Sequence, residues 1–323
     1  SKNKEDIKMK HFNKLCVSLA VFLGIIAVSA PISALAADSN NKANYFPTQQ
    51  YVSDTYKADE AYTAKVEEKQ RLAENLYQAT VCGNAKLASQ YKTQFEEFSN
   101  PNLFKALKNN AQPAATSLYS LPAAFRIWDL YQVPQEKNYY CGAAAAKSIL
   151  DNIGIYKSQT TLASNSYLQT ERFGNTPWYL SNGNEFTQFP MATTLMNAQW
   201  EVGDSAFGYV PSPLGPAGSN PLTVEQCKSY VMSTTSAFDD GYGVAACGSS
   251  VGSNPSYRLP GYPTNSNIGH WIVSDGYKDN GSTIWIVDPA KSSAVSWSGS
   301  ISAYYSIPAS LFRNFIQPRG IIW

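Results

Sequence analysis

A cysteine that precedes a run of small residues is the first candidate for chemistry in this sequence. In the stretch VPQEKNYYCGAAAAKSIL, residues 133–150, Cys141 is followed by Gly142 and four alanines. The run predicts a helix that begins at Cys141, which places the thiol beside unpaired backbone N–H groups and the positive end of the helix dipole. Both favour thiolate over thiol. A buried cysteine acting as a small hydrophobic side chain is the alternative, and this stretch alone leaves the two equally open.

One histidine is available as a base for such a thiol. The chain has two histidines, and His11 falls in an N-terminal segment that we expect to be removed, which leaves His270. Histidine is the side chain whose ordinary pKa suits proton transfer near neutral pH. One histidine and cysteines without C-x-x-C spacing do not supply a zinc site, so no metal or other cofactor is expected. A surface histidine without a catalytic role is the alternative.

A predicted β-hairpin connects His270 to an aspartate. Strands are expected at residues 270–277 and 283–287, and the Asn280-Gly281 step between them is typical of a tight hairpin turn. Counting from the turn places Asp288 within two or three positions of the residue that faces His270, close enough for contact. A carboxylate there could orient the imidazole. Asp288-Pro289 could also be an ordinary turn at a strand end.

A glutamine six residues before Cys141 could donate a hydrogen bond to a developing oxyanion. Acyl transfer through a cysteine needs such donors where the tetrahedral intermediate forms. The backbone N–H of Cys141 could be one of them, and the carboxamide of Gln135 the other. A glutamine in a loop is usually only solvated, so Gln135 by itself is weak evidence.

These motifs, taken in order, resemble the C39-like cysteine peptidases within the papain-like fold. The resemblance covers roughly residues 119–318 and rests on the order Gln135, Cys141-Gly142, His270-Trp271 and Asp288-Pro289. It implies an α+β fold in which the helix carrying the cysteine packs on an antiparallel sheet carrying the histidine and the aspartate. It also implies that the four residues act as oxyanion donor, nucleophile, general base and orienter, in that order.

The sequence departs from the family pattern in two respects. Tyr140 stands before the cysteine where many relatives carry an aspartate or another polar residue. The spacer between Cys141 and His270 is long, with Gly-, Pro-, Ser- and Asn-rich inserts around residues 202–220 and 248–266. We expect both inserts to rim the cleft, so the family does not define the substrate preference.

The first 36 residues are typical of a secretory signal peptide. Lys8, Lys10 and Lys14 precede the apolar run 15–28, and small residues up to Ala36 form an A-x-A cleavage site. Cleavage after Ala36 would leave 287 residues with 20 basic and 22 acidic side chains, a net charge of −2. This charge does not favour nucleic acid or an anionic membrane surface as partner. We therefore expect a secreted or cell-surface protein that is not inserted in the membrane after cleavage.

Three regions follow from the composition: a signal peptide at 1–36, a helical N-terminal extension at 37–118 and a catalytic domain at 119–323. In the extension, one helix is expected to end near Gly83 and a second to cross residues 87–98. A shorter helical turn around Phe104 and Leu107 and a polar linker near 109–118 should follow. The extension is either an inhibitory pro-segment or a structural arm.

Further elements are expected in the last region. Helices are predicted from Cys141 to Gly154, across residues 191–200 and from the capping box that begins at Thr223, with a strand at 243–247. Four cysteines follow Ala36. If Cys141 is reactive, at most one disulfide can form among the other three, and Cys227–Cys247 is the preferred pairing.

The favoured function is an exported thiol hydrolase that cleaves peptide or amide bonds in a peptide or protein substrate. A transferase that uses the same acyl-enzyme is the enzymatic alternative, since the first half-reaction is shared. The other alternative is a non-catalytic surface binding module with an aromatic groove. The candidates for that groove are Trp178, Tyr179, Trp271, Trp285 and Trp297.

Overall fold

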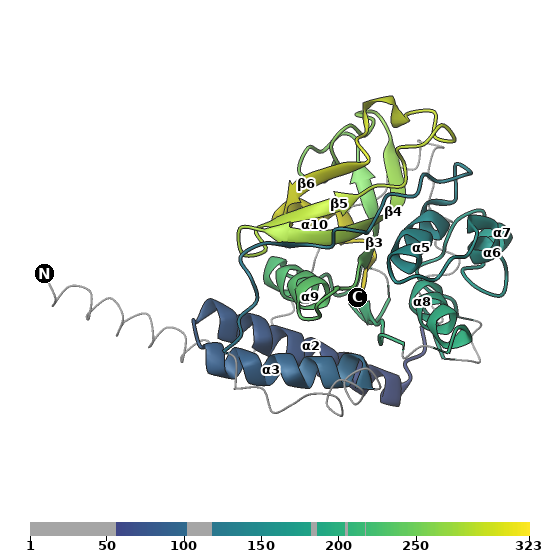
Figure 1. Cartoon of the computed structure of the whole chain (residues 1–323). Coiled ribbons are helices and arrows are strands. Elements are labelled where there is room, and N and C mark those ends of the chain that lie inside the picture. Colours follow the sequence, from purple (N-terminus) through teal and green to yellow (C-terminus); the bar gives the residue numbers. More distant parts are fainter. Residues whose placement is uncertain (1–55, 102–117, 182–185, 204–205, 217) are drawn as a thin grey trace, which may run out of the picture.

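The computed structural model describes residues 56–101, 118–181, 186–203, 206–216 and 218–323, which are coloured in Figure 1. The predicted signal peptide, the helical turn around Phe104 and Leu107, and the linker up to residue 117 lie outside the described residues. In the part of the chain that is described, no helix is long and apolar enough to cross a membrane.

An antiparallel sheet of seven strands lies at the centre of the fold. The main path runs in the order β2-β7-β3-β4-β5-β6, and β1 pairs with β4 beside it. The strands are β1 (Phe125–Arg126), β2 (Pro211–Ser212), β3 (Val244–Val251), β4 (Asn267–Lys278), β5 (Thr283–Val287), β6 (Tyr304–Pro308) and β7 (Gly320–Ile322). The last strand is inserted between β2 and β3, so the end of the chain completes the sheet.

The β4–β5 hairpin forms as the sequence predicts. β5 has the expected bounds, and β4 begins three residues earlier than expected. Between the strands, Asp279, Asn280 and Gly281 have φ values of 55°, 53° and 80°. Asparagine, aspartate and glycine are the residues that tolerate this left-handed region best, which explains why the Asn-Gly step was a sound signal.

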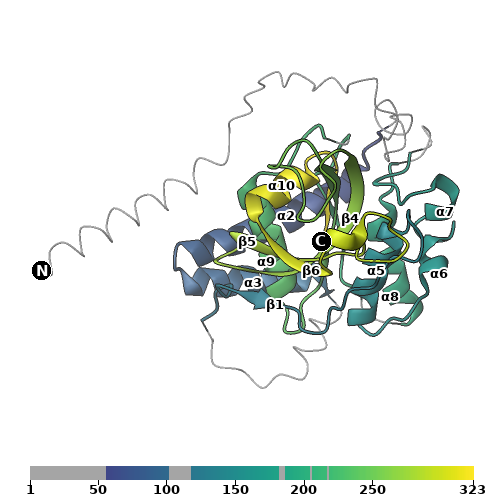
Figure 2. The same ribbon diagram turned by 90° about the horizontal axis from the view of Figure 1, so that it is seen from above.

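Two groups of helices pack against the sheet. The group that includes α5 (Cys141–Asn152), α6 (Gln159–Ala163), α7 (Thr170–Phe173) and α8 (Pro190–Glu201) lies on one side in Figures 1 and 2. Within it, α5 packs against β4 and β3. The second group, α9 (Val224–Ser236) and α10 (Ala309–Ile316), packs on β4 and β3 respectively. The predicted α+β class is confirmed, and the helix that begins with the cysteine packs on the antiparallel sheet as in a papain-like fold.

The helices also agree with the sequence patterns. The Thr223 capping box is present, with the Thr223 hydroxyl and the Gln226 side chain each bonding the other's backbone N–H. α5 ends two residues before Gly154, which has a φ of 78°. In the extension, α2 (Glu60–Val81) and α3 (Ala85–Ser99) form the two expected helices.

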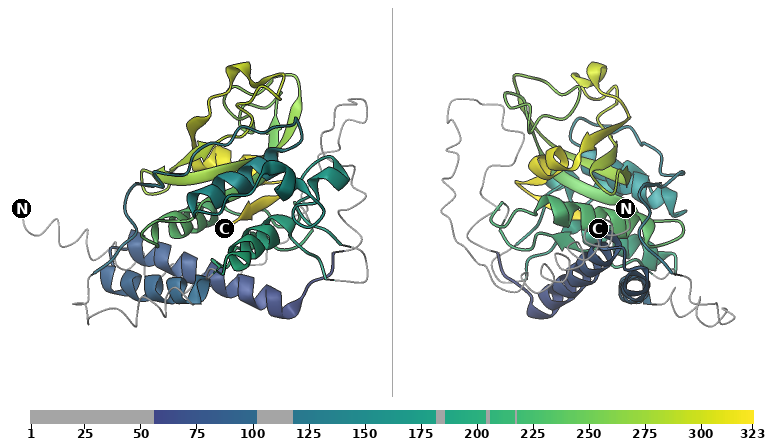
Figure 3. Two further views of the ribbon diagram at one scale, coloured as in Figure 1. Left: turned by 45° about the vertical axis from the view of Figure 1, so that its right-hand side comes forward. Right: turned by 90° about the vertical axis from the view of Figure 1, so that its left-hand side faces the viewer.

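Helices α2 and α3 share a core with the last strand. The buried Lys69 amine of α2 donates to the backbone oxygens of Gly208 (3.0 Å) and Trp323 (2.9 Å). It also lies over the Phe207 ring, 4.0 Å from the centroid. Phe95 of α3 stacks on Trp323. As Figure 3 shows, the pair of helices lies along the side of the molecule below α9.

Candidate active site

Cys141 is the first residue of α5, as its position before the alanine run predicts. The preceding Tyr140 makes no side-chain capping bond to the helix, so the first-turn N–H groups are not satisfied by a cap. The helix dipole adds positive potential at the same end. The thiol is mostly buried, with 8% of the residue exposed. The start of α5 therefore places the thiol beside backbone N–H groups that no side chain caps.

Gly142 allows the start of α5 to pack closely against a neighbouring loop. A Cβ at this position would collide with the side chain of Thr176. Thr176 is held by a hydroxyl contact with Thr170 (2.7 Å), and its carbonyl oxygen accepts from the Trp271 indole N–H (3.1 Å). The glycine after the cysteine thus has a packing role that links the helix to the strand carrying His270.

His270 and Asp288 are in direct contact behind the cysteine. His270 lies on β4, and Asp288 directly follows β5. Nε2 of His270 lies 2.9 Å from Oδ1 of Asp288, and both residues are buried. Val273 pairs with Val287, so Asp288 falls opposite Ile272, two residues from His270. This offset is within the range expected from the hairpin.

His270 also lines the same cavity as Cys141, and the two groups interact electrostatically. Because Nε2 is used by Asp288, Nδ1 is the ring nitrogen left for a further partner. Burial by itself lowers the pKa of His270, but the negative charges of Asp288 and Cys141 outweigh burial and raise this pKa to about 10. The site therefore favours a protonated imidazole beside the cysteine.

Asp288 accepts four hydrogen bonds in a fully buried position. Oδ1 accepts from His270 and from the backbone N–H of Ala290 (2.9 Å). Oδ2 accepts from the hydroxyls of Tyr262 (2.9 Å) and Tyr305 (2.8 Å). A buried carboxylate costs free energy unless it is paired and hydrogen-bonded, and these donors meet that requirement. They also prevent the carboxylate from rotating away from the imidazole.

Gln135 is buried in the loop before α5 and faces the same cavity as Cys141 and His270. Its Nε2 donates to the backbone oxygen of Lys137 (2.9 Å), and its Oε1 has no hydrogen-bond partner. The Gln135 backbone N–H donates to Pro289 (3.1 Å), and its backbone oxygen accepts from Ser292 (2.5 Å). The loop with the glutamine is therefore tied to the turn after Asp288.

The cavity in front of these residues has a volume of about 510 Å³. Besides Gln135, Cys141 and His270, it is lined by parts of the segments 138–139, 174–175, 263–269 and 294–297. Residues 263–266 belong to the second insert, which was expected to rim the cleft. The described residues of the first insert do not line it, and Pro211 and Ser212 form β2 instead. That part of the expectation is wrong, because pairing with β7 places this segment at the sheet edge.

Tyr140, the departure from the family pattern, does not line the cavity. Its hydroxyl bonds the carboxylate of Glu171, and its ring lies under the ammonium of Lys137 at 4.6 Å. The residue before the cysteine therefore contributes to packing beside the site.

The aromatic groove of the binding-module alternative does not form. Trp178 and Trp271 are buried against each other, with ring centroids 5.8 Å apart, and Tyr179 is buried as well. Trp285 lies under the Arg126 guanidinium, 5.3 Å from its ring centroid. Of the five candidates, Trp297 alone lines the cavity. Most of these rings lie in the core, which is the more common location of large aromatic side chains.

Among the described residues, the cysteines and the acidic side chains make no further metal or disulfide site. Cys227 and Cys247 are not joined by a disulfide, so the preference for that bridge is wrong. Burial raises the pKa of Cys227 to about 12 and raises that of Cys247 as well, which makes both poor nucleophiles. Within the described ranges, no cluster of three or more His, Cys, Asp or Glu side chains could hold a metal ion.

Comparison with known families agrees with this geometry. The model of the Peptidase_C39 like family matches residues 128–307, which contain Gln135, Cys141, His270 and Asp288. The chain belongs to this family. No curated protein gives a significant match to this chain. The family assignment confirms the resemblance drawn from the four motifs and, with the antiparallel sheet, the papain-like fold.

The sequence did not reveal the side chains behind the His270–Asp288 pair. Tyr262 lies in an insert and Tyr305 on the neighbouring strand β6, and neither has a local motif that distinguishes it from the other 19 tyrosines. Asp275, a buried carboxylate in the middle of β4, was also missed. An aspartate within a predicted buried strand is unusual, and that could have served as a signal.

Proposed function

We propose that this protein is a cysteine peptidase in which Cys141 is the nucleophile, His270 the general base and acid, and Asp288 the orienting group. The observation that carries the proposal is the buried His270, which is held by Asp288 through Nε2 and lines the same cavity as Cys141. A pKa of about 10 for His270 keeps the imidazole protonated near neutral pH. It favours a thiolate–imidazolium pair, which is the reactive form of such a thiol.

In this mechanism, the Cys141 thiolate attacks the carbonyl carbon of the scissile amide and forms a C–S bond. The tetrahedral intermediate collapses as the C–N bond breaks, and the proton on Nδ1 of His270 moves to the departing amine. Water then attacks the thioester while His270 accepts one of its protons. The C–S bond breaks, the acid product leaves, and the thiolate–imidazolium pair is restored.

Two groups support the oxyanion of the intermediate in this proposal. The backbone N–H of Cys141 stands at the uncapped start of α5. Nε2 of Gln135 donates one hydrogen to the backbone oxygen of Lys137, and in this proposal its second hydrogen serves the oxyanion in the cavity that Gln135 lines. Two preorganised donors of this kind are what acyl transfer requires.

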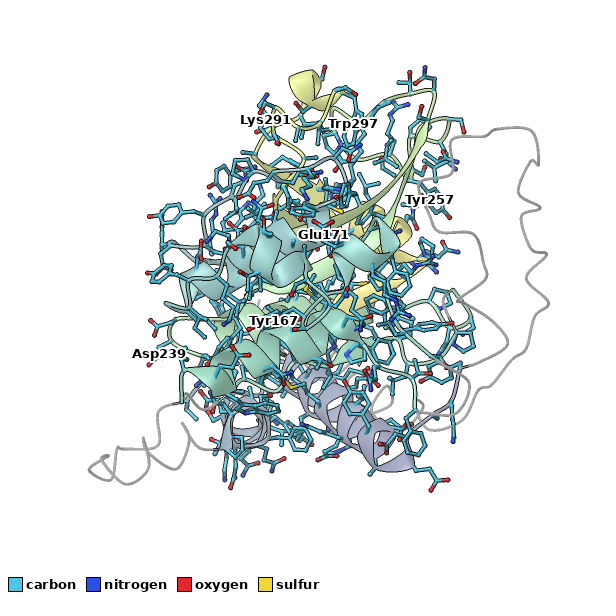
Figure 4. All side chains as sticks on the ribbon, turned by 90° about the vertical axis from the view of Figure 1, so that its right-hand side faces the viewer. Tyr167, Glu171, Asp239, Tyr257, Lys291 and Trp297 are labelled. Atoms are coloured by element: carbon cyan, nitrogen blue, oxygen red, sulfur yellow. The ribbon has the colours of Figure 1, made fainter. Side chains whose placement is uncertain are left out.

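Helices α2 and α3 fit a structural arm better than an inhibitory segment. The described residues that line the cavity all fall between Gln135 and Trp297. In Figure 4, Trp297 lies at the end of the molecule remote from the two helices. The buried contacts of Lys69 and Phe95 with Trp323 support the same proposal.

Export belongs to the proposal as well. It rests on the charged start, the apolar run and the A-x-A site before Ala37. Mass spectrometry of the protein released by an exporting host would give the N-terminus, which we expect to be Ala37.

Thiol alkylation tests the proposed site. Full-length protein, Cys141→Ala and His270→Ala are treated with iodoacetamide between pH 5 and 8, and each cysteine is quantified by peptide mapping. We expect rapid labelling of Cys141 that persists below pH 7 and slows in His270→Ala. Cys82, which is half-buried, serves as an internal control whose rate should not change. Slow labelling of Cys141 that is indifferent to His270 would contradict the proposal.

A digest of a mixed peptide library then tests the reaction itself. New peptide termini should form with the unmodified protein and be absent with Cys141→Ala. Formation of amide adducts with an added amine, in place of free acids, would indicate transfer instead of hydrolysis.

A further inference from the structure

The strand that carries His270 contains an irregularity between that residue and the hairpin turn. Near the turn, Tyr277 pairs with Ile284 and Gly276 with Trp285. Beyond it, Ser274 pairs with Ile286 and Val273 with Val287. One extra residue, Asp275, thus lies in β4 with no partner of its own in β5, which is the arrangement of a β-bulge.

This extra residue decides which face of the sheet His270 occupies relative to Asp288. Residues directly opposite in an antiparallel pair point to the same face, and faces alternate along each strand. In the observed register Asp288 is opposite Ile272 and therefore shares a face with His270. In a regular ladder without the bulge, Asp275 would pair with Ile286, Asp288 would be opposite Val273, and His270 would point to the other face. The contact of 2.9 Å between His270 and Asp288 thus depends on the bulge.

Strand β1 holds the bulge in place. Oδ2 of the buried Asp275 accepts from Nε of Arg126 at 2.8 Å, and its backbone oxygen accepts from the Ile127 N–H at 2.8 Å. Arg126 pairs with Gly276 in the β1–β4 ladder. Gly276 has a φ of 154°, and a Cβ there would collide with the carbonyl oxygen of Phe125. Glycine is required for this close approach.

The buried ion pair between Arg126 and Asp275 carries a free-energy cost that needs an explanation. Oδ1 of Asp275 is buried without a hydrogen-bond partner, and burial raises the pKa of Asp275 despite the opposing effect of Arg126. An apolar residue at a buried strand position would avoid this cost. The Arg126 guanidinium is itself fixed over the rings of Trp285 (5.3 Å) and Tyr304 (5.6 Å).

We propose that Arg126 and Asp275 are positioning residues, whose ion pair pins the β4 bulge and thereby keeps His270 and Asp288 on one face of the sheet. The pair lies outside the cavity and acts only through the register of the hairpin. The inference rests on the proposed function for its catalytic meaning, but the His270–Asp288 contact can be measured without any substrate.

Nuclear magnetic resonance of His270 tests this directly. In the full-length chain with His11→Gln, His270 is the only histidine, so its ring signals need no further assignment. Asp275→Ala is expected to abolish the exchange-protected Nε2–H signal and to lower the pKa of His270 from about 10 toward its ordinary value. The rate of Cys141 alkylation should fall by about 100-fold, the effect of a displaced catalytic group.

Three further variants separate positioning from general destabilisation. Arg126→Gln removes the other partner, which is partly exposed, and should reproduce the result if Asp275→Ala does not fold. Asp275→Asn keeps the shape and one hydrogen bond and should restore part of the Nε2–H signal. Ile284→Val weakens the same hairpin outside the bulge and should leave the His270 signal and pKa unchanged.

The outcomes distinguish this inference from the proposed function. A folded Asp275→Ala or Arg126→Gln protein with an unchanged Nε2–H signal and an unchanged His270 pKa would overturn the role of the ion pair. A protein whose Cys141 is unreactive before any substitution would instead contradict the proposed function. In that case, the nuclear magnetic resonance result still decides the positioning role.

Discussion

The two halves of the candidate site are built by different means. The start of α5 presents Cys141 through local features: a helix that begins there, an uncapped first turn and a glycine that fits against Thr176. The β4–β5 hairpin presents His270 and Asp288 through tertiary features: a bulge, a ladder with β1, and tyrosines from distant segments. A local motif is sufficient to place a nucleophile, whereas a pair of residues on two strands depends on the register between them.

This difference predicts how each half should respond to substitution. The hairpin half tunes charge, because Asp288 raises the pKa of His270 and is itself held by four donors. In the proposed mechanism, the helix half supplies the reactive sulfur and, with Gln135, the donors for the oxyanion. Variants in the hairpin should therefore alter thiol activation and its pH dependence, while Gln135 variants should alter turnover alone.

Asp288→Asn should have the largest effect. A neutral carboxamide cannot balance the positive charge of the imidazolium. Its NH₂ group would also stand against one of the donors that now bond to the carboxylate. Turnover of a library-derived peptide should fall by about 10⁴-fold, the loss seen when the orienting aspartate of such a triad is replaced.

The same variant should shift the pH profile in a defined direction. The thiolate–imidazolium pair exists only below the His270 pKa, so activity of the unmodified protein should decline as pH rises through about 10. Without the Asp288 charge that pKa falls, and the alkaline limit moves to lower pH. Asp151→Asn, which breaks an ion pair with Lys147 on α5 (2.9 Å), is the control with the same charge change. An alkaline limit that does not move in Asp288→Asn would show that the hairpin does not tune the thiol.

Gln135→Ala should have the next largest effect. Loss of one oxyanion donor lowers turnover by about 10²–10³-fold, while the rate of Cys141 alkylation should stay nearly unchanged, because no oxyanion forms in that reaction. Gln132→Ala is the matched control, since Gln132 uses its amide on the backbone oxygens of Asp288 and Lys291. Equal losses of turnover and of alkylation in Gln135→Ala would mean that this residue acts on the thiol and not on the oxyanion.

Tyr262→Phe and Tyr305→Phe should have the smallest effect, measured by turnover and by denaturant unfolding. Each removes one donor from Oδ2 of Asp288 and leaves the other. The free energy of unfolding should fall by about 1.5–3 kcal/mol per variant, the contribution of one hydrogen bond to a charged group. Because the carboxylate is then less neutralised, the alkaline limit of activity should move slightly upward.

The double variant, Tyr262→Phe with Tyr305→Phe, tests whether the two hydroxyls act on the same oxygen of Asp288. Removal of both hydroxyls should cost more than the sum of the single effects, since the second loss leaves Oδ2 without a donor. Tyr257→Phe, whose hydroxyl bonds Gln317 (3.2 Å), is the control. Strictly additive effects on stability would mean that the two tyrosines do not act on a shared oxygen.

Much of the architecture could be predicted because it depends on short-range chemistry. The Asn280-Gly281 turn, the Thr223 capping box and the helix that begins at Cys141 are each specified by neighbouring residues, and all three are confirmed. The Cys227–Cys247 bridge and the aromatic groove were wrong for one reason. Both required knowledge of which side chains meet across the core, and composition does not supply it.

By itself, the sequence predicted the four polar residues of the candidate site and their order, and it indicated the family to which the chain belongs. It did so because helix starts, turns and strand alternation are local properties of the chain. Only the tertiary structure decided that His270 and Asp288 share a face, since the bulge at Asp275 shifts the β4–β5 register by one residue and is held by contacts from another strand. It alone also supplied the Tyr262 and Tyr305 donors, because long-range packing brings hydroxyls from separate segments to one buried carboxylate.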